Sequence, residues 1–211
     1  MTMNVLQFIF TIVFVTASGA LAPGPLFFAT LSYGARSGVR SGLVFSVAHT
    51  FVEFALIMLL ALGLLTVASE PLVKIIIGVT GGAALIVFGV AQIWNATRIQ
   101  VNKHMQYIAS HKHLFVVGIV FTGLNPYFIL WWLTVGAQLI IVALEFAAFL
   151  GVLFMYLCHV WMDYVWLTTV AYFAKKGSNV LGSKSYRFLI IVFSVILIYF
   201  GLTFLTSAIQ V

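Results

Sequence analysis

Long apolar stretches dominate the chain, and charged residues or helix breakers separate them into six segments. The segments run over residues 5–33, 42–68, 71–93, 114–135, 146–173 and 188–209. A membrane-spanning helix needs about 20 predominantly apolar residues, so the pattern predicts six transmembrane helices. The apolar stretch 114–173 is too long for one span at about 1.5 Å per residue, and we expect a turn near residues 136–145.

The composition supports this prediction and excludes an ordinary soluble domain. Hydrophobic residues make up 64% of the 211 residues and charged residues only 7%, whereas soluble domains hold about 25% charged residues. In so apolar a chain, the net charge of +6 indicates basic loops rather than nucleic-acid binding. One cysteine, Cys158, cannot form an internal disulfide. No catalytic constellation or nucleotide motif indicates an enzyme, and no prosthetic group is implied.

The basic residues predict the orientation in a prokaryotic plasma membrane. Nine of the 10 Lys and Arg residues fall in odd-numbered loops, and Lys74 alone lies near the opposite face. The positive-inside rule places these loops in the cytoplasm and both termini outside. No basic residue precedes Arg36, so the first segment lacks the positive region of a signal peptide and is interpreted as a retained span. If the break at Pro23 makes this segment re-entrant, the N-terminus changes side.

Unusual residues recur at matching places in the two halves of the chain. Segments one and four each carry a break, Pro23-Gly24-Pro25 in the first and Asn125-Pro126 in the fourth. Segments two and five each carry a histidine followed four residues later by an acid. Interrupted segments at corresponding positions are typical of secondary transporters built from inverted repeats.

These recurrences predict the fold. We expect an all-α integral membrane protein with one transmembrane domain over residues 1–211. Its six transmembrane helices form two inverted three-helix repeats, over about 1–97 and 114–211, and helices 1 and 4 are broken by proline. A basic cytoplasmic loop over residues 98–113 joins the two repeats.

The two histidine–acid pairs are the predicted substrate or proton site. His49 lies one helical turn from Glu53, and His159 lies one turn from Asp163, so each pair shares a helix face. An ionisable group at mid-bilayer costs about 2.5–3.5 kcal/mol, so we expect these side chains to face the protein interior or a wet cavity. Histidine titrates near neutral pH, which suits the loading and release of a proton or a cationic group. Two structural hydrogen-bonded pairs between helices are the alternative.

The two breaks are the predicted backbone site, formed by Pro23, Gly24, Pro25, Asn125 and Pro126. Proline removes a backbone donor and clashes with the preceding turn, and free backbone groups at membrane depth must be buried or face water. Half-helices that start after each break would aim free N–H groups and a positive dipole end into the cavity. A carboxylate suits that end, and the substrate ammonium suits an acid of the predicted site. Packing kinks are the alternative.

Several aromatic residues are weaker candidates. Tyr127, Tyr156 and Trp161 can line the cavity beside the histidines. Trp131 and Trp132 are interpreted as anchors at the lipid interface or as packing residues.

The break motifs resemble those of a known family. Residues 22–25, followed by Gly34, Gly38 and Gly42, resemble the lysine exporter (LysE/RhtB) family, and Asn125-Pro126 resembles its second signature. The size and segment count agree over the whole chain. The resemblance implies a secondary transporter that exports amino acids or related small metabolites by alternating access, coupled to proton or cation exchange. The partners that the resemblance implies are a small-molecule substrate, an amino acid, and the lipid bilayer that surrounds the protein.

Two other functions stay open. The wider superfamily includes divalent-metal exporters, and His49, Glu53, His159 and Asp163 would be suitable ligands for a transported ion. No resident metal is expected. A non-transporting membrane scaffold is the second alternative. The glycines at four-residue spacing permit close helix contact, which favours internal packing over a homodimer.

Overall fold

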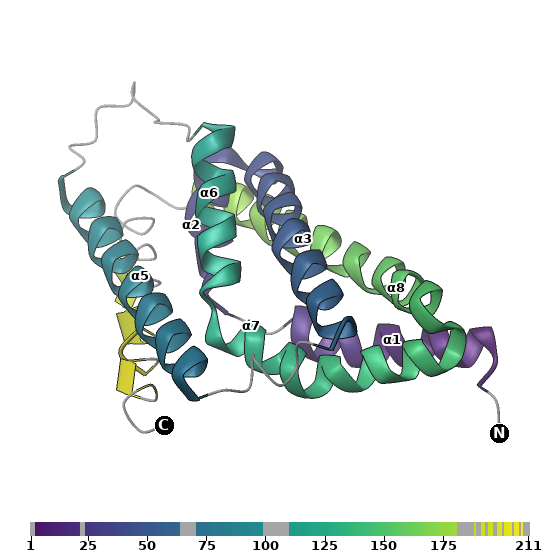
Figure 1. Cartoon of the computed structure of the whole chain (residues 1–211). Helices are drawn as coiled ribbons and strands as arrows, with labels where there is room; N and C mark the ends of the chain where they lie inside the picture. Colours follow the sequence, from purple (N-terminus) through teal and green to yellow (C-terminus); the bar gives the residue numbers. More distant parts are fainter. Residues whose placement is uncertain are drawn as a thin grey trace.

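The structure, a computed structural model, describes residues 3–21, 24–63, 71–98 and 110–180, and single residues or short runs between 188 and 208. All regular structure in these residues is helical, as the sequence predicts (Figure 1). The elements are α1 (Val5–Ala20), α2 (Pro25–Ser37), α3 (Val39–Ala61), α5 (Pro71–Arg98), α6 (His111–Gly123), α7 (Pro126–Trp131), the π-helical turn η1 (Trp132–Gly136) and α8 (Ala137–Val180).

Prolines mark the starts of three helices. Pro25, Pro71 and Pro126 are the first residues of α2, α5 and α7, a position where the missing N–H costs nothing and the ring fixes a helical φ. The first predicted segment is therefore two helices, α1 and α2, and the fourth continues from α6 into α7. Pro23 lies outside the described residues.

Helix α8 contains the reversal that the sequence predicts near residues 136–145, but at a different place. The chain stays helical through Glu145 and breaks at Ala147 (φ −155°) and Ala148 (φ 50°). Figure 1 shows α8 running along the lower edge of the molecule and returning toward α2. Gly136 does not make a turn: it is the last residue of η1, and the indole of Trp132 occupies the place that a Cβ would take. We call residues 149–180 the return arm.

Two of the described helical stretches are long and apolar enough to cross a membrane, Val39–Ala61 and Pro126–Gly177. An 18-residue window in each has a mean hydropathy of 2.1 and 2.4, respectively, and the second stretch contains the reversal. The breaks after α1 and α6 leave helices of 16 and 13 residues, shorter than the about 20 that a single span needs. The six spans therefore stay a prediction, and most of the predicted loop 98–113 lies outside the described residues.

Small residues bring the helix backbones together. A Cβ on Gly42 of α3 would lie 2.6 Å from the carbonyl oxygen of Leu167 in the return arm, and a Cβ on Gly34 of α2 would lie 2.7 Å from Cα of Ala171. On α6, a Cβ on Gly118 would lie 2.6 Å from Cβ of Ala48. These glycines serve internal packing, and they hold α3 close enough to the return arm for short side chains to meet.

The apolar core has two parts. One cluster includes Ile57 on α3 and Met155 on the return arm, and the other includes Phe45 and Leu167 on the same two helices. On α3, the first predicted histidine–acid pair lies between Phe45 and Ile57. On the return arm, the second pair lies between Met155 and Leu167. The four polar side chains are thus flanked on both sides by apolar core residues.

Helix α5 packs against the C-terminal segment. A Cβ on Gly82 would lie 2.7 Å from the carbonyl oxygen of Gly201, and a Cβ on Gly201 would lie 2.7 Å from that of Gly82. The described residues between 188 and 208 are helical, which agrees with the sixth predicted segment.

Candidate functional site

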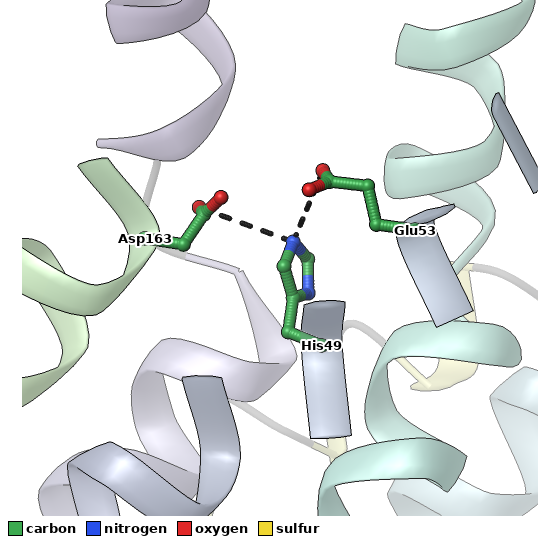
Figure 2. A group of neighbouring side chains, drawn as sticks. All are labelled: His49, Glu53 and Asp163. Carbon is green, nitrogen blue, oxygen red and sulfur yellow. Dashed lines mark ion pairs between the residues drawn. The ribbon is translucent and has the colours of Figure 1, made fainter. Parts of the chain in front are cut away.

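The four titratable side chains of the two predicted pairs lie together. Glu53 Oε1 lies 3.3 Å from His49 Nε2 and 2.9 Å from His159 Nε2. The carboxylate of Asp163 lies 3.9 Å from His49 Nε2 and 3.6 Å from His159 Nε2. Figure 2 shows the His49 imidazole between the two carboxylates. Each histidine therefore faces both acids, so the pairs form a single cluster across α3 and α8.

Glu53 is the centre of this cluster. Its side chain is almost fully buried, with 1% of the residue exposed. Oε1 accepts from the indole Nε1 of Trp132 at 3.2 Å and lies within hydrogen-bond distance of His159 Nε2. A carboxylate at such a depth is stable only with partners of this kind, because burying an unpaired charge is costly.

Each histidine is also held from behind by a threonine of the opposite half of the chain. Thr16 Oγ1 of α1 lies 2.9 Å from His159 Nδ1, and Thr122 Oγ1 of α6 lies 3.1 Å from His49 Nδ1. An ionised carboxylate only accepts hydrogen bonds, so the Nε2 atom that faces it carries a hydrogen. In the neutral imidazole, Nδ1 then accepts from the threonine hydroxyl. Both threonines thus favour the tautomer that addresses the acids.

Asp163 has weaker partners than Glu53. Its contacts of 3.6 and 3.9 Å to the histidines exceed hydrogen-bond length. Asp163 Oδ2 and Glu53 Oε2 are both buried and have no hydrogen-bond partner. Each acid therefore keeps one buried acceptor oxygen with unused capacity.

A cavity of about 420 Å³ lies beside the cluster. A volume of this size suits a small organic molecule. The cavity wall includes all four residues of the cluster and the starts of α2 and α7. The remaining lining residues are mainly apolar or aromatic: Gly19, Ala20, Leu26, Phe27, Tyr127, Phe128, Trp131, Trp132, Trp166 and Leu167.

The two chain breaks meet at this cavity. A Cβ on Gly24 would lie 3.7 Å from Nδ2 of Asn125, and both residues line the wall. Asn125 caps α7, because its side chain accepts from the backbone N–H of Tyr127 at 3.1 Å. Gly24 has no side chain, and no side chain caps α2. The backbone N–H groups in the first turn of α2 therefore lack a side-chain cap, whereas one of those in α7 is already bonded to Asn125.

The weaker candidates separate in the structure. Tyr127 lies in the cavity wall. Tyr156 does not; it is buried and its hydroxyl donates to the carbonyl oxygen of Thr50. Trp161 does not line the cavity either, since it is exposed on the outer face of α8 and donates to the carbonyl oxygen of Cys158. Trp132, interpreted as an interface anchor or packing residue, is 1% exposed and bonds Glu53.

Thr16, Thr122 and the role of Trp132 were not found from the sequence. Threonine is common in membrane helices and usually bonds its own backbone, so no local pattern distinguishes these two. A tryptophan directly after a broken segment is a signal that could have been used. Their contacts depend on how α1, α6 and η1 dock against α3 and α8.

Three side chains of the cluster are also suitable for binding a cation. Ligand atoms of His49, Glu53 and Asp163 all lie within 4.8 Å of one another. Zinc bonds such atoms at about 2.0–2.2 Å, so the three ligands would have to close slightly around an ion.

Comparison with known families identifies the class of protein. The model of the LysE type translocator family matches residues 17–208, nearly the whole chain. The chain therefore belongs to the LysE type translocator family. No curated protein and no solved structure matched. Membership makes the protein a membrane transporter rather than an enzyme. It supports small molecules such as amino acids or related compounds as substrates. It also counts against the scaffold alternative.

Proposed function

We propose that the protein exports amino acids or related small metabolites from a prokaryotic cell by alternating access, coupled to the exchange of protons or cations. The cavity at the four-residue cluster carries this proposal. It combines two titratable imidazoles with two carboxylate oxygens that have no hydrogen-bond partner. Groups of this kind inside a membrane protein usually mark a substrate or proton pathway.

The proposal includes two inverted repeats, and backbone conformation supports them. Gly38 (φ 61°, ψ −150°) lies eleven residues before His49, and Ala148 (φ 50°, ψ −140°) lies eleven residues before His159. Both residues precede the helix that bears a histidine–acid pair. The reciprocal contact of Gly82 with Gly201 is what a two-fold relation between α5 and the C-terminal segment would produce. Rocking of one repeat against the other would open the cavity to alternate sides.

In the proposed bound state the two poles of an amino acid contact different parts of the wall. The ammonium lies between Glu53 Oε2 and Asp163 Oδ2. The carboxylate lies at the uncapped first turn of α2. The indole Nε1 of Trp166, which is buried and without a hydrogen-bond partner, can donate to the carboxylate, because Trp166 stacks on Phe27 of that turn at 5.9 Å.

Coupling is proposed to act through the histidines. Protonation of His49 or His159 would weaken the hold of the carboxylates on a substrate cation, so proton entry and substrate release would be linked. A membrane potential of 100 mV acts on each moved charge with about 2.3 kcal/mol. In the proposed orientation, the basic loops lie in the cytoplasm and both termini lie outside. The potential would then change the free energy of moving a net charge outward.

Counterflow in proteoliposomes tests the proposal. Liposomes loaded with one unlabelled amino acid should accumulate the labelled one, and an imposed pH gradient should change the rate. Absence of counterflow for every amino acid tested would overturn the proposal. His159→Gln should lower the response to the pH gradient, because it removes a titratable group but keeps a donor near Glu53.

A divalent metal ion is the second candidate substrate, favoured by the convergence of His49, Glu53 and Asp163. Metal-dependent thermal stabilisation of the purified protein, lost in Glu53→Gln and Asp163→Asn, would support this candidate. Stabilisation by amino acids with no response to Zn²⁺ or Mn²⁺ would exclude it.

A further inference from the structure

We infer that the transported amino acid has a single cationic group and a large apolar or aromatic side chain. The inference rests on the proposed function and adds the class of side chain. Its basis is the composition of the cavity wall, in which two acids stand among six aromatic rings.

The negative charge in the described cavity wall comes from two acids. Glu53 and Asp163 are the only acids among the described residues that line the cavity, and they lie on either side of His49. Glu53 Oε1 already accepts from Trp132 and faces both imidazoles, whereas Glu53 Oε2 and Asp163 Oδ2 have no hydrogen-bond partner. One ammonium group has three donors and is sufficient for these two oxygens.

The rest of the wall is aromatic. Rings from four elements line the cavity that holds the acids: Phe27, Tyr127, Phe128, Trp131, Trp132 and Trp166. Contact with an apolar side chain gains about 0.8 kcal/mol for each buried methylene. Leucine, methionine or phenylalanine would obtain this gain, whereas serine or threonine would not.

A second cation on the substrate is disfavoured. The side-chain ammonium of lysine would have to leave water for a wall whose described lining holds no acid besides Glu53 and Asp163. A cation–π contact returns about 2 kcal/mol when desolvated, less than the several kcal/mol that an unpaired buried ion costs. Lysine and arginine should therefore be poor substrates.

Counterflow with a panel of labelled amino acids tests the inference. Phenylalanine and leucine should exchange at least about tenfold faster than lysine, arginine or serine. Thermal stabilisation in detergent by phenylalanine but not by lysine gives a second readout that does not depend on flux. Lysine or serine exchange as fast as phenylalanine would overturn the inference and leave the proposed function intact. Exchange of no amino acid would overturn both.

A matched pair of variants tests the aromatic wall. Phe27→Ala removes a cavity ring that stacks on Trp166 at 5.9 Å, and it should lower the phenylalanine-to-serine rate ratio about tenfold. Phe51→Ala removes an exposed ring that pairs with Phe115 at the same distance of 5.9 Å but lies outside the cavity lining. It should leave the ratio unchanged. Equal ratios in the two variants would contradict a role of the wall in selection.

Discussion

The two histidine–acid pairs have the same spacing but different surroundings. On α3, Glu53 bonds Trp132 and lies 2.9 Å from His159. On α8, Asp163 lies 3.6 Å or more from both imidazoles. The acids of the two pairs are therefore unequal: the carboxylate of Glu53 is held in place, and that of Asp163 is loosely held.

This difference suggests how one cluster can be both stable and functional. A fully satisfied buried network is rigid, whereas an acid with unused acceptors can exchange partners as a substrate enters. We expect Glu53 to organise the site and Asp163 to be the more available to substrate. The variants below measure the two roles separately.

Glu53→Gln should have the largest effect. It removes the charge that faces both imidazoles, and a buried ion pair that loses one partner costs about 3–5 kcal/mol. Thermal unfolding in detergent should show this loss of stability, and counterflow should disappear. Wild-type stability in this variant would mean that Glu53 is not the organising acid.

Asp163→Asn should remove transport with little loss of stability. Its contacts are long, so the expected change in unfolding free energy is about 0.6 kcal/mol, the average for side-chain contacts within a membrane. Counterflow should fall at least about tenfold, which corresponds to about 1.4 kcal/mol. Equal destabilisation of Asp163→Asn and Glu53→Gln would remove the distinction between the two acids.

The start of each pair-bearing helix provides a third contrast. Gly38 tolerates its positive φ, and Ala148 has a similar conformation that an L side chain rarely adopts. Gly38→Ala should lower the unfolding free energy by about 1–2 kcal/mol, since the nearest atom to the new Cβ is 3.5 Å away and only the backbone is strained. Ala148→Gly should raise the melting temperature. A decrease for Ala148→Gly would contradict the equivalence of the two positions.

The threonines behind the imidazoles should have the smallest effects. Thr16→Val should cost about 1 kcal/mol, because the buried Nδ1 of His159 loses its partner. Thr122→Val should cost less, because the His49 side chain is 12% exposed and water can replace the hydroxyl. Thr134→Val is the control: its exposed hydroxyl bonds only carbonyls of its own helix and its loss should be neutral. Chemical denaturation in detergent would rank the three.

Much of the site followed from local pattern. The four-residue spacing put His49 with Glu53 and His159 with Asp163, and the cost of charge in a bilayer indicated that all four face inward. The prolines indicated both breaks. The reversal in α8 was misplaced because neither residue at the break, Ala147 or Ala148, is a proline or a glycine. The nearest glycine, Gly151, follows the break, where a Cβ would meet the carbonyl oxygen of Ala143. An apolar run does not by itself show where it ends.

The amino-acid sequence was enough for the helical class, the membrane environment, the family and the paired titratable residues, because each depends on composition or on spacing along one helix. The unequal surroundings of the two acids depend on how the helices pack against one another. Trp132 reaches Glu53 only because η1 packs beside α3, and Thr16 reaches His159 from 143 positions away in the chain. Contacts between distant segments depend on how whole helices pack, which no local periodicity encodes.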